Sequence, residues 1–124
     1  MILGVDNIGI ASRDPEALAA FYRSIGFQIT YRNERGITLE AGSAKFFMFK
    51  AAPTDGISRS QDIFSNPPGV DHISLLVDDV DSMYTALRPQ SIEFISAPAD
   101  QDWGARTAAF HDPEGNLVFF LRWL

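Results

Sequence analysis

Apolar and polar positions follow two matching series along this 124-residue chain. The segment VDNIGI at residues 5–10 is matched by VDHISL at residues 70–75, and both are short apolar strand patterns with Asp at the second position. In each half the strand is followed by a polar turn and then by apolar residues at helical spacing. Similarity between two parts of one chain indicates repeated structural units. The pattern therefore predicts a duplicated chain.

Both predicted helices carry start signals. In the first half Asp14 precedes Pro15, and Asp is a favoured capping residue while Pro suits the first helical position. The second half repeats the plan, with Asp79 or Asp81 at the start and Pro89 as the stop.

Each predicted helix is followed by three further strand patterns, separated by turns rich in Gly, Asp or Asn. The result is a β-α-β-β-β module in each half. Since neither half would bury much core alone, we expect one α+β domain over residues 1–124, with modules at 1–51 and 70–124 and a linker at 52–69. The strands expected after the two opening ones lie at 27–31, 37–40, 45–50, 93–95, 106–111 and 117–123.

Composition and charge exclude several classes of function. Ten Lys and Arg residues stand against 16 Asp and Glu residues, giving a net charge of −6, and there is no basic stripe of the kind that binds nucleic acid. The absence of Cys removes disulfides, thiolate nucleophiles and zinc sites that need sulfur. No leader pattern or long apolar run is found, so we expect a cytoplasmic protein without membrane contact.

The repeat and the closing segment WGARTAAFHDPEGNLVFFL together resemble the vicinal oxygen chelate superfamily, which includes glyoxalases, bleomycin-resistance proteins and extradiol dioxygenases. The most specific part is the DPEGN turn at 112–116 with the preceding Trp103, Gly104 and Phe110. The resemblance implies two curled mixed sheets around a cavity. It also implies, in metal-using members, a divalent ion held by side chains of the first and last strands of each half.

The positions that match those metal ligands are mostly unsuitable here. They fall on Asn7, on Phe47 or Met48, on His72 and on Phe119, so one imidazole is the single strong ligand. A site of this type needs about three protein ligands. We therefore expect no cofactor, and His72 is the residue that would contribute if a divalent metal were bound.

The apolar residues at these positions favour binding of a flat or hydrophobic small molecule. For each Phe the alternative is an ordinary place in the core, and for His72 it is a hydrogen-bonded core residue. His111 is expected at the surface or in the last hairpin. The candidate ligand-binding residues are Asn7, Phe47, His72, Trp103, Arg106 and Phe119.

The resemblance to the metal-free, bleomycin-resistance-like branch predicts a protein that sequesters an apolar or aromatic ligand. We expect a homodimer, because each half presents strand edges and an apolar face that a small domain cannot cover. The alternative is a metal-dependent glyoxalase-like lyase or isomerase, or a ring-cleaving dioxygenase, with a remodelled site around His72. No nucleophile elbow, phosphate loop or zinc-protease motif is present, and the sequence leaves open whether the protein is an enzyme.

Overall fold

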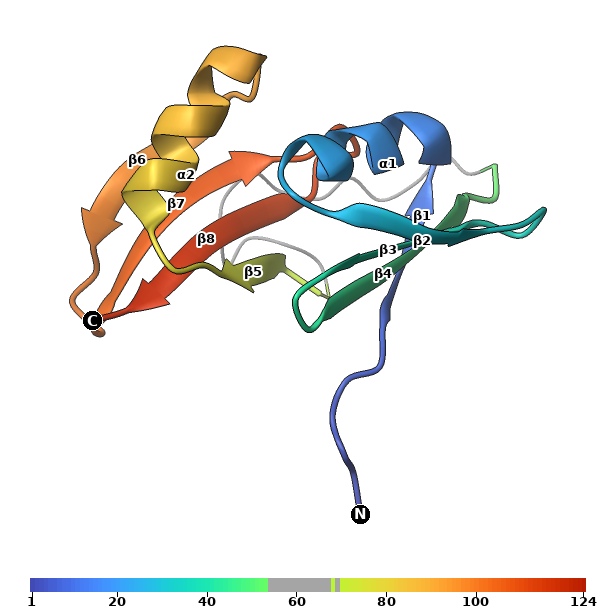
Figure 1. Cartoon of the computed structure of the whole chain (residues 1–124), viewed down its shortest axis with the longest axis horizontal. Helices are drawn as coiled ribbons and strands as arrows, with labels where there is room; N and C mark the ends of the chain where they lie inside the picture. The colour runs from blue at the N-terminus through green and yellow to red at the C-terminus, as the bar shows by residue number, and fades with distance from the viewer. Residues whose placement is uncertain (54–67, 69) are drawn as a thin grey trace. The chain divides into compact units, whose positions relative to one another are not determined.

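The computed structural model of the chain describes residues 1–53, 68 and 70–124 (Figure 1). The chain divides into two compact units, Met1–Asp55 and Gly56–Leu124, and each unit is described by itself. Most of the predicted linker at 52–69 lies outside the described residues. That the two modules form a single domain with a cavity between them stays a prediction.

The first unit is a four-stranded mixed sheet with one helix. Its strands are ordered β1-β4-β3-β2, with β1 parallel to β4 and the other neighbours antiparallel. The elements are β1 (Ile8–Ser12), α1 (Pro15–Ser24), β2 (Gln28–Arg32), β3 (Ile37–Ala41) and β4 (Ala44–Lys50).

The second unit repeats this topology, with strands ordered β5-β8-β7-β6 and β5 parallel to β8. The predicted duplication and the α+β class are therefore confirmed, and each sheet is open rather than closed into a barrel. The elements are β5 (His72–Leu76), α2 (Val80–Leu87), a short 3-10 helix η1 (Arg88–Gln90), β6 (Phe94–Asp100), β7 (Ala105–His111) and β8 (Leu117–Trp123).

Equivalent carboxylates cap the two helices. The side chain of Asp14 accepts a hydrogen bond from the amide of Ala17 at 3.1 Å, and that of Asp79 accepts one from the amide of Ser82 at 3.0 Å. Each satisfies one of the amides that a helix start leaves without a partner. Of the two candidates for the second helix, Asp79 is thus the cap. This hydrogen bond also holds the pKa of Asp79 below its ordinary value.

The helix of each unit packs on one face of its own sheet (Figure 1), and that face holds the largest fully buried side chains. Successive side chains of a strand point to opposite faces of the sheet. We call the face that does not carry the helix the helix-distal face. On β4, Phe46 and Met48 are buried while Phe47 is half-buried; on β8, Phe120 is buried while Phe119 is half-buried.

Strand β6 is longer than predicted. The sequence indicated a strand at 93–95, whereas the structure continues it through Ala97 and Pro98 to Asp100. Its pairing with β7 shifts register twice, between Phe94 and Ser96 and between Ser96 and Ala99. Pro is tolerated because β6 is an edge strand, where a missing amide donor breaks no hydrogen bond of the sheet. In the part of the chain that the structure describes, no helix is long and apolar enough to span a bilayer.

Candidate ligand-binding surface

His72 opens β5, and its ring is fixed by the residue before it. Its Nδ1 lies 2.8 Å from Oδ2 of Asp71, and both side chains are partly exposed. A carboxylate only accepts, so Nδ1 carries the hydrogen and Nε2 of the neutral ring is left as an acceptor. The first repeat has the same local arrangement, since Nδ2 of Asn7 donates to Oδ2 of Asp6 at 2.8 Å.

Phe119 lies against His72 on the helix-distal face of the second sheet. In the register of β5 and β8, His72 is opposite Leu117 and Ser74 is opposite Phe119. The two rings meet edge to face, with centroids 5.1 Å apart and planes at 78°. The structure thus brings together two of the predicted ligand-binding residues, and it does so through the parallel pairing of the first and last strands of the module.

Trp103 lies at the other end of the same sheet. It lies in the turn between β6 and β7, and its ring meets that of Trp123 at 5.5 Å and 74°. Both indoles are more than half exposed. Trp123 follows Phe119 by four residues on β8, so both point from the helix-distal face, with backbones about 13 Å apart. Trp123 was not among the predicted site residues, although an exposed Trp at a strand end is a signal in itself.

Arg106 lies on the opposite face of that sheet. Its guanidinium donates to both carboxylate oxygens of Asp81 at 2.7 and 2.9 Å, and to Asp100 at 3.0 Å. The hydrogen bonds with Arg106 lower the pKa of Asp81, and those with Asp81 and Asp100 raise the pKa of the guanidinium. Arg106 therefore ties the first turn of α2 to the edge strand, and the structure does not bring it together with His72 and Phe119.

The remaining two candidates, Asn7 and Phe47, belong to the first unit. Asn7 is exposed just before β1. Phe47 stacks on Phe49 on the helix-distal face, with centroids 5.7 Å apart. Its ring also lies over Gly36, where an added Cβ would be 2.9 Å from the ring and 2.4 Å from a backbone carbonyl of β4. Phe47 is thus in contact with both Phe49 and Gly36.

His111, the last residue of β7, departs from its prediction. It was expected at the surface or in the hairpin, but it is half-buried and paired with Leu117 of β8. Leu117 and Phe119 share the helix-distal face, so His111 is on that face too. The strand ends at residue 111 as predicted, and the pairing with β8 decides the face of this last residue.

The donor set does not fit a divalent metal. Among the described residues, no three His, Cys, Asp or Glu side chains gather closely enough to hold an ion. The positions that match the metal ligands of relatives carry an amide at Asn7 and rings at Phe47 and Phe119, which leaves the imidazole of His72. We therefore derive no chemical step through a metal.

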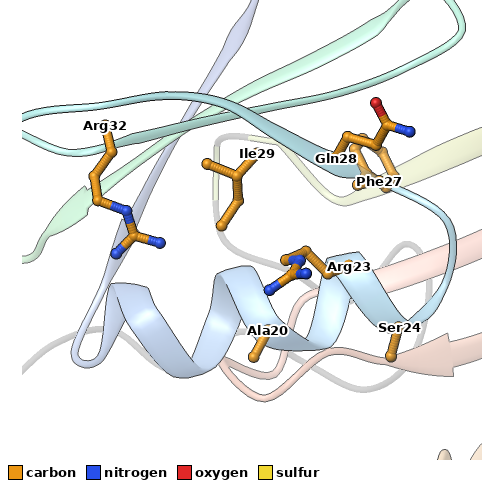
Figure 2. A pocket seen from close by; sticks show the side chains of 7 residues that line it. All are labelled: Ala20, Arg23, Ser24, Phe27, Gln28, Ile29 and Arg32. Atoms are coloured by element: carbon orange, nitrogen blue, oxygen red, sulfur yellow. The ribbon is translucent and has the colours of Figure 1, made fainter.

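A groove of about 740 Å³ lies elsewhere, between α1 and β2 of the first unit (Figure 2). The side chains of Arg23 and Arg32 reach over it on either side of Ile29. Arg32 is already engaged in an ion pair with Glu16. None of the predicted site residues lines this groove, whose lining consists of Ala20, Arg23, Ser24, Phe27, Gln28, Ile29 and Arg32.

The fold and these sites define a class of proteins. Residues 4–120 match the model of the glyoxalase/bleomycin resistance protein/dioxygenase superfamily, and the chain belongs to that superfamily. Its sequence is 28% identical over 122 residues to a bleomycin resistance protein of Klebsiella pneumoniae, covering 88% of this chain and 84% of that protein.

Two solved structures show how far the similarity extends. A glyoxalase family protein from Enterococcus faecalis superposes with a TM-score of 0.79 at 20% identity, covering 97% of this chain and 98% of that one. A bleomycin-binding protein crystallised with bleomycin superposes with a TM-score of 0.70 at 26% identity, covering 96% and 98% of the two chains. The predicted superfamily is confirmed.

Proposed function

We propose that this protein binds an aromatic or apolar small molecule against the helix-distal face of its second unit, and that binding needs no metal. The observation that carries the proposal is the contact between Phe119 and His72. Phe119 replaces a carboxylate that metal-using relatives would offer and supplies an apolar ring face instead. His72, held by Asp71, supplies one hydrogen-bond acceptor beside it. An apolar surface with a few fixed polar atoms is the usual composition of a small-molecule site.

Bleomycin is the ligand that the relatives suggest for a first test. A curated relative is a bleomycin resistance protein, and a structural relative was crystallised with bleomycin bound. The net charge of −6 supports binding of a cationic aromatic molecule, because long-range attraction concentrates such ligands near the surface.

The experiment is a calorimetric titration of the purified protein with metal-free bleomycin. We expect saturable one-site binding, weakened at least tenfold in Phe119→Leu, which removes the ring but keeps an apolar side chain. Tyr31→Leu is the matched control, because Tyr31 is an exposed aromatic residue on β2 of the first unit. Equal losses in both variants would contradict the proposed location.

Metal independence is tested on the same sample. Because a structural or catalytic metal stabilises the native state that binds it, its removal lowers the melting temperature. We expect EDTA to change neither the melting temperature nor the affinity for bleomycin. A fall of several degrees that zinc, iron, nickel or manganese reverses would show that His72 has further ligands.

A homodimer is part of the proposal. Met1, Ile2, Leu3 and Val5 precede β1 and are almost fully exposed, and exposed apolar side chains in a group favour association. Sedimentation equilibrium at tens of micromolar should give twice the chain mass of 13.7 kDa. A single species at the chain mass would refute the dimer without affecting the location of the ligand site.

A further inference from the structure

The groove between α1 and β2 of the first unit combines positive charge with an apolar side chain (Figure 2). Arg23 comes from the last turn of α1 and Arg32 from the end of β2, and their side chains lie on either side of Ile29. Ile29 is half-buried and both arginines are exposed, so the groove is accessible from solvent. Its volume of about 740 Å³ lies within the range of about 300–1,000 Å³ that is usual for small-molecule sites.

An irregular pairing of the edge strand β2 places Arg32 at the groove. Ile29 is opposite Leu39 and Arg32 is opposite Ile37, and the register shifts between Ile29 and Tyr31. Leu39 and Ile37 are two residues apart on β3 and therefore project from the same face. Ile29 and Arg32 share that face although they are three residues apart, whereas regular alternation would send Arg32 to the opposite face. Bulges redirect side chains at sheet edges in this way, and they are frequent beside functional sites.

The two arginines differ in the partners that they already have. Nη1 of Arg32 donates to Oε1 of Glu16, so these two charges balance each other. An exposed ion pair contributes little to stability, so this pair alone does not account for the bulge. Arg23 forms no ion pair with any residue that the structure describes. The groove thus keeps one uncompensated positive charge, in a chain whose net charge is −6.

We propose that this groove binds an organic monocarboxylate with an apolar or aromatic body. The guanidinium of Arg23 donates two parallel hydrogen bonds to the carboxylate, because its planar fork matches the two oxygens of that group. The apolar body lies against Ile29, and Arg32 bounds the other side of the groove. The single uncompensated charge favours a singly charged anion, and contact with Ile29 favours one with an apolar body over a small inorganic ion. The site belongs to the first unit and is independent of the surface around Phe119 that we propose for bleomycin.

The test is binding of 2-naphthoate, followed in ¹H–¹⁵N spectra of the backbone amides, with 2-naphthamide as a neutral probe of the same shape. We expect 2-naphthoate to move the amide resonances of β2 and of the last turn of α1 in a saturable way. The amide probe should bind at least tenfold more weakly. Absence of binding at millimolar 2-naphthoate, equal binding of the two probes, or movement confined to other parts of the chain overturns the inference.

Three variants locate the contacts. Arg23→Gln should bind 2-naphthoate at least tenfold more weakly, and Ile29→Thr, which keeps a β-branched side chain, at least threefold more weakly. Arg35→Gln is the matched control, because Arg35 is exposed in the turn between β2 and β3, lies outside the groove and carries the same charge. It should bind within twofold of the parent.

Equal losses in Arg23→Gln and Arg35→Gln would show long-range attraction without a site and would overturn the inference, as would unchanged binding in Arg23→Gln. The melting temperature of each variant separates loss of the site from loss of the fold. Arg23→Gln should bind bleomycin as the parent does, so failure of this inference and failure of the proposed function are distinguished on the same samples.

Discussion

Phe119 and Phe120 are adjacent on β8 and point to opposite faces, so they form an internal pair for testing the location of the site. Phe120 is 1% exposed and packs between the rings of Phe94 and Phe110 beneath α2. Phe119 is half-buried and meets His72 at one edge. Truncation to Ala should therefore affect stability at one position and ligand affinity at the other.

The expected magnitudes follow from burial. A buried aromatic side chain removes about 150–250 Å² from water, which at about 25 cal/mol per Å² corresponds to about 4–6 kcal/mol. Truncations of buried Phe cost about 3–5 kcal/mol, so Phe120→Ala should lower the free energy of unfolding by about 4 kcal/mol. Phe119→Ala should lower it by about 1–2 kcal/mol, because the space left opens to the side of the sheet and traps no cavity.

Tryptophan fluorescence during urea unfolding measures these changes in the free energy of unfolding, because both Trp residues, Trp103 and Trp123, lie in the second unit. With a shift of about 4 °C per kcal/mol for a chain of this length, Phe120→Ala should melt about 15 °C below the parent and Phe119→Ala about 4–8 °C below. Bleomycin affinity should fall at least tenfold in Phe119→Ala. Equal losses of stability with unchanged affinity would show that Phe119 is a core residue and refute its place in the site.

Three further predictions concern the supports of the two units. Asp81→Asn should destabilise at pH 7, and its difference from the parent should shrink as the pH falls below 3.8. The reason is that Arg106 lowers the pKa of Asp81, and stability from a lowered carboxylate pKa is lost as pH falls through it; urea midpoints at pH 7 and at decreasing pH below 3.8 check this. Gly36→Ala should cost about 2 kcal/mol or more because its Cβ would meet a backbone carbonyl at 2.4 Å, whereas Gly42→Ala, strained only by a φ of +55°, should cost about 1 kcal/mol. Trp103→Phe should shift the emission of the remaining tryptophan, because the two indoles are in contact.

Local signals explain why the duplicated fold could be predicted from the sequence. The helix starts depend on Asp14 and Asp79 and on amides three residues later, so each is encoded within one turn. The end of β6 depends instead on pairing with β7, and Pro98 in isolation indicates a loop. Tertiary pairing overrides the local preference there, and no local pattern contains that information.

The candidate site depends on which face each strand residue takes. The resemblance to the superfamily assigned His72 and Phe119 to the same cavity, and the two rings are in contact because β5 and β8 pair in parallel. Arg106 falls within the strand predicted at 106–111, but its face was not predicted, and the structure places the guanidinium on the helix side beside Asp81. Neighbouring residues of a strand point to opposite faces, so the face of a candidate residue decides which groups its side chain can meet.

The alternation of side chains along each strand also explains how the two halves keep the same fold and carry different side chains on one face. The helix-facing positions of the last strands stay apolar in both units, with Phe46 in β4 and Phe120 in β8 each about 1% exposed, because the core of each unit depends on them. On the helix-distal face, Phe47 and Phe119 are only half-buried. There the first unit stacks Phe47 on a second ring, whereas the second unit sets Phe119 edge to face against the imidazole of His72. Half-buried side chains such as these can change at less cost to the core than Phe46 and Phe120, so the two modules keep one fold while they differ on this face.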